Sequence, residues 1–118
     1  MPSKKIVIFA SGSGSSVENI ILKFERNPKI EVSKIYCNNS KAFLLQRIKK
    51  YKVKKLVFNS RDLKTNLILN DLNGENPDLI VLAGFLKKIP ENIINSFPKK
   101  IINIHPSLLP KYGGKGMF

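Results

Sequence analysis

Short runs of apolar residues alternate along the chain with segments in which apolar side chains recur every three or four positions. A short apolar run between turn residues is typical of a strand buried on both faces, and the wider spacing is typical of an amphipathic helix. The pattern predicts strands at residues 6–10, 32–37, 56–58, 79–83 and 101–105. It predicts one helix that begins near residue 15 and three further helices over residues 43–51, 63–72 and 90–97.

Alternating strands and helices favour right-handed βαβ units and a parallel sheet. We therefore expect an α/β fold, Rossmann-like, with helices on both faces of the sheet. The chain of 118 residues has room for one modest core, so residues 1–118 are expected to form a single domain. Ser15 and Glu18 match a capping box for the first helix, and residues 73–77, Asn-Gly-Glu-Asn-Pro, predict a turn before the fourth strand.

The chain carries 21 basic and 8 acidic residues, a net charge of +13. Such a charge is found in nucleic-acid binders, but here the lysines are scattered as pairs and form no stripe interleaved with aromatic residues. We therefore favour a solvated basic surface that attracts anionic substrates, and no specific nucleic-acid interface.

No apolar run approaches the length needed to span a membrane, and the run near the start is too short for a signal peptide. A cytoplasmic location is the resulting expectation. Cys37 is the only cysteine, so neither an internal disulfide nor a cysteine metal site is expected, and we predict a small buried side chain there.

Residues 11–16, Ser-Gly-Ser-Gly-Ser-Ser, join the first predicted strand to the first helix. Free backbone N–H groups at a helix start suit a phosphate, and glycine allows the phosphate to approach closely. The third glycine of a dinucleotide motif and the Gly-Lys-Ser/Thr of a P-loop are missing, so NAD or ATP binding is poorly supported. The alternative is a turn whose serines only cap the helix.

Two further connections are candidates for binding. Residues 84–89, Gly-Phe-Leu-Lys-Lys-Ile, bring apolar and basic side chains to the end of the fourth strand, although an ordinary connector with a solvated lysine pair is the alternative. Arg61 has the donors to bind a phosphate or carboxylate through two hydrogen bonds, but a lone surface arginine is commoner.

The chain's only histidine, His105, follows Asn103 by two positions at the end of the last predicted strand. In a strand these two side chains share one face, while Ile102 and Ile104 enter the opposite apolar layer. Pro106 ends the strand, which places the histidine at a carboxyl edge where open α/β sheets bind ligands. The alternative is a histidine hydrogen-bonded within a loop, with Asn103 capping a backbone group.

Three motifs occur together in this order: SGSGS after the first strand, PDLIVLAGF over residues 77–85, and NIHPSLLPKY over residues 103–112. From residue 6 to about residue 116 the chain resembles the amino-terminal part of the phosphoribosylglycinamide formyltransferase family, folate-dependent enzymes of purine synthesis. Methionyl-tRNA formyltransferase and formyltetrahydrofolate deformylase share the fold and the catalytic Asn and His, but the glycine–serine loop and Pro106 favour the first family. A non-catalytic fragment that binds a phosphate or nucleotide is a further alternative.

The resemblance implies a role for particular residues of this chain. Asn103 and His105 would be the catalytic pair. The ribonucleotide would be bound at its phosphate by Gly14, Ser15 and Ser16 and elsewhere by Arg61 and Gly84. The folate would be bound by Leu86, Lys87, Ile89 and Asn103.

The resemblance also implies small-molecule substrates, glycinamide ribonucleotide and 10-formyltetrahydrofolate as co-substrate, with no metal. The resemblance is compatible with a homodimer or with a second polypeptide that completes the fold. In the family a catalytic aspartate comes from beyond the glycine-rich segment at residues 113–116, and the chain contains no evident counterpart. The expectation is therefore a truncated formyltransferase, deficient in catalysis unless a second polypeptide completes it.

Overall fold

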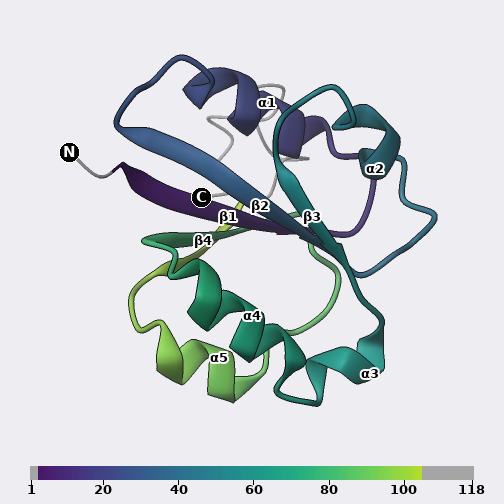
Figure 1. Ribbon diagram of the computed structural model, residues 1–118. Coiled ribbons are helices and arrows are strands. Elements are labelled where there is room, and N and C mark those ends of the chain that lie inside the picture. The colour runs from purple at the N-terminus through teal and green to yellow at the C-terminus, as the bar shows by residue number, and fades with distance from the viewer. Residues whose placement is uncertain (1–2, 105–118) are drawn as a thin grey trace, which may run out of the picture.

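The computed structural model describes residues 3–104, which form one parallel β-sheet between two layers of helices (Figure 1). The strands are β1 (Lys4–Ala10), β2 (Ile30–Cys37), β3 (Lys54–Val57), β4 (Leu79–Ala83) and β5 (Ile101–Ile104). The helices are α1 (Ser15–Phe24), α2 (Leu44–Arg47), α3 (Ser60–Leu63), α4 (Leu67–Glu75) and α5 (Glu91–Ser96). The predicted α/β, Rossmann-like fold is confirmed.

The order of the strands places the candidate loops next to one another. The order is β3-β2-β1-β4-β5, and every neighbouring pair is parallel. The chain builds outward from β1 to β3, then crosses back to place β4 on the other side of β1. The loops after β1 and β4 therefore diverge at a topological switch point, where open α/β sheets bind ligands.

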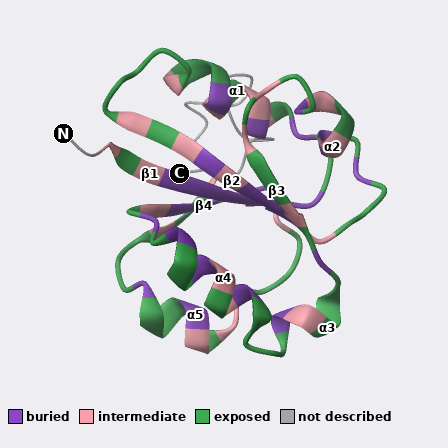
Figure 2. Ribbon diagram, in the orientation of Figure 1, coloured by how far each residue is buried: buried purple, intermediate pink, exposed green. Residues whose placement is uncertain are grey.

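The core has two parts, one on each face of the sheet. Alternate residues of β1 point to opposite faces, so Ile8 packs beneath α1 and α2 while Phe9 packs against the α4 and α5 side. Phe9 also stacks on Tyr36 of β2, with ring centroids 4.7 Å apart. Figure 2 shows the central strands as the most continuously buried part of the ribbon. Burial on both faces explains why β1 is apolar throughout its second half.

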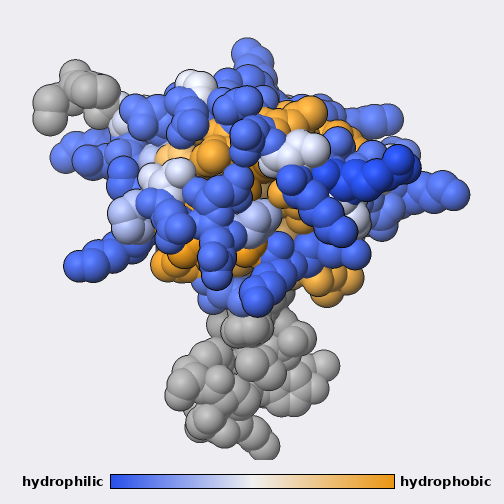
Figure 3. Space-filling view, turned by 90° about the horizontal axis from the view of Figure 1, so that it is seen from below, coloured by the Kyte–Doolittle hydropathy of each residue, from blue (hydrophilic) through white to orange (hydrophobic). Residues whose placement is uncertain are grey.

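The surface seen from below in Figure 3 is mostly hydrophilic, with hydrophobic residues visible in the gaps. This is the side on which α3, α4 and α5 lie in Figure 1. Within residues 3–104, no helix has the length and apolar character required to cross a membrane.

The predicted helix over residues 63–72 is wrong in its extent. Two helices occupy this part of the chain, and a capping box formed by Asn59 and Asp62 starts the first of them, α3. The predicted turn over residues 73–77 is also wrong at its start, because α4 continues through Gly74 to Glu75 and ends at Asn76, which has a φ of 52°. The contacts of the Glu75 carboxylate with the sheet override the turn preference of the Asn-Gly pair.

The capping box predicted for Ser15 and Glu18 does not form. Gly14 occupies the N-cap position, so Ser15 is the first residue of the helix and its side chain is not in a position to cap it. The Glu18 carboxylate instead accepts hydrogen bonds from the Tyr51 hydroxyl at 2.6 Å and from Arg47 at 3.3 Å. These contacts join α1 to the segment around α2, which is a single turn rather than the predicted helix over residues 43–51.

Two acidic side chains of α4 fix this helix to the sheet. Asp71 accepts hydrogen bonds from Lys34 Nζ at 2.7 Å and from the Tyr36 hydroxyl at 2.6 Å. Glu75 is buried and accepts from the Ser33 hydroxyl at 3.2 Å and from Lys54 Nζ. Burial alone would raise the pKa of Glu75, but the hydrogen bond and charge of Lys54 outweigh it and lower the pKa below its usual value.

Two of the three leucines of α4 provide a matched test of the core. Leu72 is fully buried, whereas Leu67 is 48% exposed. Leu72→Ala should lower the free energy of unfolding by about 2–5 kcal/mol, because it leaves a cavity. Leu67→Ala should cost less than about 1 kcal/mol. Urea unfolding followed by circular dichroism measures both, and equal losses would contradict the placement of α4.

Glu75→Gln tests the contribution of the buried carboxylate through its pH dependence. A lowered pKa in the folded state means that the ionised group stabilises the fold above its unfolded pKa, and that this stability is lost as the pH falls through the folded pKa. At pH 7 the variant should be less stable than the wild type by roughly 1.5–3 kcal/mol. The difference should shrink below about pH 4.

The control for this measurement is Glu91→Gln on α5. Glu91 is exposed and forms no ion pair with any residue of 3–104. Its substitution should leave the free energy of unfolding nearly unchanged at every pH. If Glu75→Gln changed the free energy of unfolding as little as this control does at every pH, the carboxylate would not hold α4.

Candidate functional site

A small cavity of about 110 Å³ lies where the loop after β1 meets the end of β4. The residues that line it are Gly12, Ser13, Gly14, Ser15, Ser16, Ala83 and Gly84. The structure therefore brings together the predicted phosphate residues and Gly84, which are far apart in the sequence. Ser15 and Ser16 are the first residues of α1, so their backbone N–H groups have no acceptor within the helix.

Gly14 adopts a backbone conformation that would be strained with any other residue. Its φ is 81°, in the left-handed region, and its carbonyl accepts a hydrogen bond from the Glu18 N–H at 2.8 Å. A Cβ at this position would lie 2.4 Å from Leu44 Cβ and 2.8 Å from Leu44 Cα. The Leu44 N–H also donates to the Gly12 carbonyl at 3.1 Å. Helix α2 therefore packs directly against the glycine–serine loop.

A second cavity, of about 470 Å³, lies beside β4 and β5 on the α5 side. It is lined by Leu82, Phe85, Lys87, Lys88, Ile89, Ile94, Phe97, Lys99, Ile101 and Asn103. Three predicted site residues, Lys87, Ile89 and Asn103, thus meet around one cavity. Its lining combines apolar side chains with lysines and contains no acidic residue, which suits a ligand with an apolar body and negative charge. Leu86 does not line it, and its side chain is 82% exposed.

The two cavities are neighbours along the chain and across the sheet. Gly84 lines the first and Phe85 lines the second. Asn103 pairs with Leu82 of β4, and β4 lies next to β1. Asn103 is therefore two strand spacings, about 10 Å, from β1. This is the arrangement in which one substrate can reach from the glycine–serine loop to the amide of Asn103.

His105, the other half of the predicted pair, lies outside the described residues. The neighbouring Ile104 packs against the core on the α1 side, as expected. Ile102 was expected in the same apolar layer but is 45% exposed. Its strand, β5, is the edge strand of the described sheet, so the layer that covers the central strands does not cover it fully.

The structure does not bring Arg61 to the other candidate residues. Arg61 is exposed on α3, which follows β3 at the opposite edge of the sheet from β5. It lines neither of the two cavities.

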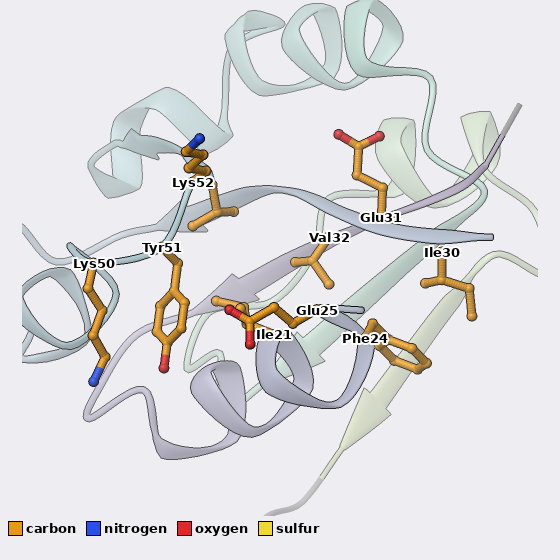
Figure 4. Close-up of a pocket in the computed structure, with 10 residues that line it drawn as sticks. Ile21, Phe24, Glu25, Ile30, Glu31, Val32, Lys50, Tyr51 and Lys52 are labelled. Carbon is orange, nitrogen blue, oxygen red and sulfur yellow. The ribbon is translucent and has the colours of Figure 1, made fainter. Parts of the chain in front are cut away.

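A third cavity, also of about 470 Å³, lies between α1, the start of β2 and the segment before β3 (Figure 4). Ile21 and Phe24 of α1, Val32 of β2 and Tyr51 contribute to its lining. It opens toward the amino-terminal end of β2, away from the loops after β1 and β4. None of the predicted site residues in the described part of the chain lines it.

Cys37 is buried, as predicted, and donates a hydrogen bond to the Asn39 carbonyl at 3.3 Å. Burial raises the pKa of its thiol, which makes the reactive thiolate scarce. Among residues 3–104, no three His, Cys, Asp or Glu side chains are grouped so that they could hold a metal ion.

The buried hydroxyl of Ser11 contacts the loop that both cavities share, and it is not among the residues predicted from the sequence. Its Oγ donates to Asn38 Oδ1 at 2.5 Å and accepts from the Leu86 N–H at 2.9 Å. Asn38 and Leu86 are 27 and 75 positions away along the chain, so no local pattern indicates these contacts. The only sequence clue is that Ser11 directly follows the buried strand β1.

The family model described as formyl transferase matches residues 4–117. The phosphoribosylglycinamide formyltransferase of Haemophilus influenzae is 35% identical over 117 residues, which cover 94% of this chain and 55% of the relative. The enzyme of the same name from Bacillus subtilis is 31% identical, with 94% and 60% covered. The chain thus spans little more than half the length of these curated relatives.

Solved structures agree with the sheet described above. Glycinamide ribonucleotide transformylase 1 from Geobacillus kaustophilus matches with a TM-score of 0.80 and 32% identity, covering 97% of this chain and 64% of that one. Phosphoribosylglycinamide formyltransferase from Brucella melitensis matches with a TM-score of 0.81 and 30% identity, covering 95% and 62%.

Gly14→Ala should destabilise the protein by about 2 kcal/mol or more, because it combines a left-handed φ with a clash against α2. Gly12→Ala is the matched control in the same loop, since a Cβ there meets nothing within 4 Å. Its effect should stay within about 0.5 kcal/mol. Urea unfolding measures both variants, and a Gly14 variant as stable as the control would contradict the described loop.

Proposed function

The chain belongs to the formyl transferase family, and we propose that it transfers the formyl group of 10-formyltetrahydrofolate to the amine of glycinamide ribonucleotide, a step of purine biosynthesis in the cytoplasm. The observation that carries this proposal is the adjacency of the two cavities, one lined by Gly84 and the other by Phe85, just after β4. One has the backbone and hydroxyl groups that suit a phosphate, and the other has the apolar and basic lining that suits a folate. The names of the relatives support the ribonucleotide and the transfer of a formyl group, and the folate donor rests on the family resemblance.

The ribonucleotide would enter with its phosphate at Gly14, Ser15 and Ser16. The first N–H groups of α1 and the positive end of the helix dipole favour an anion there. The hydroxyls of the two serines add donors. Gly84, on the opposite wall of the same cavity, leaves room for the part of the ribonucleotide that continues toward β4 and β5.

The folate would occupy the second cavity. Its flat ring system would lie against apolar side chains such as Ile89, while Lys87 would meet its negatively charged end. Leu86, exposed at the rim, would cover the bound folate. The net charge of +13 favours the approach of both anionic substrates.

Formyl transfer begins when the amine of the ribonucleotide attacks the formyl carbon. Negative charge then develops on the formyl oxygen and positive charge on the nitrogen. The Asn103 amide, fixed on a strand, would donate a hydrogen bond to that oxygen, a contribution on the order of 3 kcal/mol. His105, outside the described residues, would donate a second hydrogen bond or move the proton released by the amine to N10 of the folate. The bond between the formyl carbon and N10 then breaks, and tetrahydrofolate leaves.

Two measurements test the proposal. Calorimetry should detect binding of glycinamide ribonucleotide to the 118-residue chain, with inorganic phosphate as a competitor. Formyl transfer is measured for the chain alone and with the carboxyl-terminal part of the Haemophilus influenzae relative added as a second polypeptide. Binding of the ribonucleotide without folate binding or transfer would indicate a phosphate-binding module instead.

Asn103→Ala should lower the rate of formyl transfer about 100- to 1,000-fold, since it removes the donor to the developing oxyanion. The affinity for glycinamide ribonucleotide should change little. Asn95→Ala on α5 is the control, because Asn95 is exposed and lines neither cavity. An Asn103 variant that transfers formyl groups at the wild-type rate, or a wild type that transfers none in either form of the assay, would show the proposal to be wrong.

A further inference from the structure

Ser11 connects the carboxyl ends of three strands. It directly follows β1 and is 4% exposed. Its hydroxyl donates to Asn38 Oδ1, just after β2, and accepts from the Leu86 N–H, in the loop after β4. Its backbone N–H donates to the Gly84 carbonyl at 3.2 Å. One residue thus holds the loop after β4 at two points, Gly84 and Leu86.

These two points flank Phe85 in the chain, where the lining passes from one cavity to the other. Gly84 lines the cavity of the glycine–serine loop, and Phe85 lines the cavity beside β5. The Phe85 ring packs edge-on against Phe9, with centroids 5.3 Å apart, which anchors the side chain. The Ser11 contacts anchor the backbone before and after that ring.

Apart from the packing of the Phe85 ring, the segment held in this way has few other restraints. Gly84 has a φ of 72°, so the chain changes direction directly after β4. The Leu86 side chain is 82% exposed and supplies no packing. Among residues 3–104, the Leu86 N–H has Ser11 Oγ as its hydrogen-bond acceptor. Without the hydroxyl, a backbone donor next to the second cavity loses its partner.

We propose that Ser11 is a positioning residue that fixes the separation of the two cavities by holding the backbone of residues 84–86 against the end of β1. This inference rests on the proposed function, in which the amine arrives from the first cavity and the formyl group from the second. Reaction between two bound groups depends steeply on their separation and orientation. Ser11 touches neither substrate and acts through the loop.

Amide hydrogen exchange tests the tether without any ligand. In Ser11→Ala the Leu86 amide should exchange roughly two- to tenfold faster than in the wild type, the range expected for loss of one hydrogen bond. Ser11→Cys keeps the size of the side chain but is a weaker hydrogen-bonding group, so exchange should be intermediate. If the alanine variant does not fold, the cysteine variant supplies the comparison.

Ser33→Ala is the matched control. Ser33 is also 4% exposed and its hydroxyl also makes a buried hydrogen bond, to Glu75, but on β2 away from both cavities. It should lower stability without changing exchange at Leu86. Unchanged exchange at Leu86 in both Ser11 variants would overturn the tether, whether or not the proposed function holds.

The ratio of the affinities for glycinamide ribonucleotide and inorganic phosphate tests whether Ser11 positions the loop after β4. Inorganic phosphate needs only the glycine–serine loop, whereas glycinamide ribonucleotide also reaches the Gly84 wall. In Ser11→Ala the affinity for the ribonucleotide should fall about tenfold while that for phosphate changes less than about twofold. A merely structural role would lower both affinities equally, so the ratio of the ribonucleotide affinity to the phosphate affinity would stay unchanged.

The outcomes separate the two proposals. An altered ratio in the Ser11 variants and an unchanged ratio in Ser33→Ala support positioning. Faster Leu86 exchange with an unchanged ratio overturns it, because the tether then exists without setting the separation of the cavities. If the wild type binds neither ligand, the proposed function fails, and with it the positioning role, while Leu86 exchange still reports whether the tether forms.

Discussion

The central strand β1 is excluded from water on both faces, and the remaining elements are arranged around that constraint. Ile8 and Phe9 are adjacent residues that are each fully buried, one under each helical layer. A strand of this kind needs a hydrogen-bonded neighbour along each edge and helices above and below. β2 and β4 supply the edges, and their opposite positions create the switch point. The candidate site follows from the burial of a strand that takes no part in the chemistry itself.

The sequence was sufficient for the class of fold because burial on both faces leaves a direct trace in it. The strand over residues 79–83 has the predicted bounds, and the last strand begins at residue 101 as predicted. The three earlier strands differ from the prediction only at their ends. What the sequence did not reveal depends on contacts between distant residues. α4 runs through an Asn-Gly pair because Glu75 reaches Ser33 and Lys54, 42 and 21 positions away. Local turn preference carries no information about such partners.

The same distinction applies to the candidate site. Gly14, Ser15, Ser16 and Gly84 surround one cavity because each directly follows a buried strand or begins a helix, and such positions are visible in the sequence. Lys87, Ile89 and Asn103 meet for a similar reason. Arg61 follows the edge strand β3 and lines neither cavity, and its binding role stays a prediction. His105 lies outside the described residues, so its role stays a prediction that rests on the family.

The two neighbours of β1 also set the order in which the protein can assemble during synthesis. β2 pairs with β1 as soon as a short helix has been made, but β4 comes much later, as shown by the hydrogen bond from the Lys5 N–H to Asp78, 73 positions apart. Until then, one edge of the most apolar strand has no partner and is open to wrong association. Sheets closed by such distant pairs fold slowly and depend on protection of the early strands. For this chain the sheet around β1 therefore stays incomplete until residues 79–83 have been made.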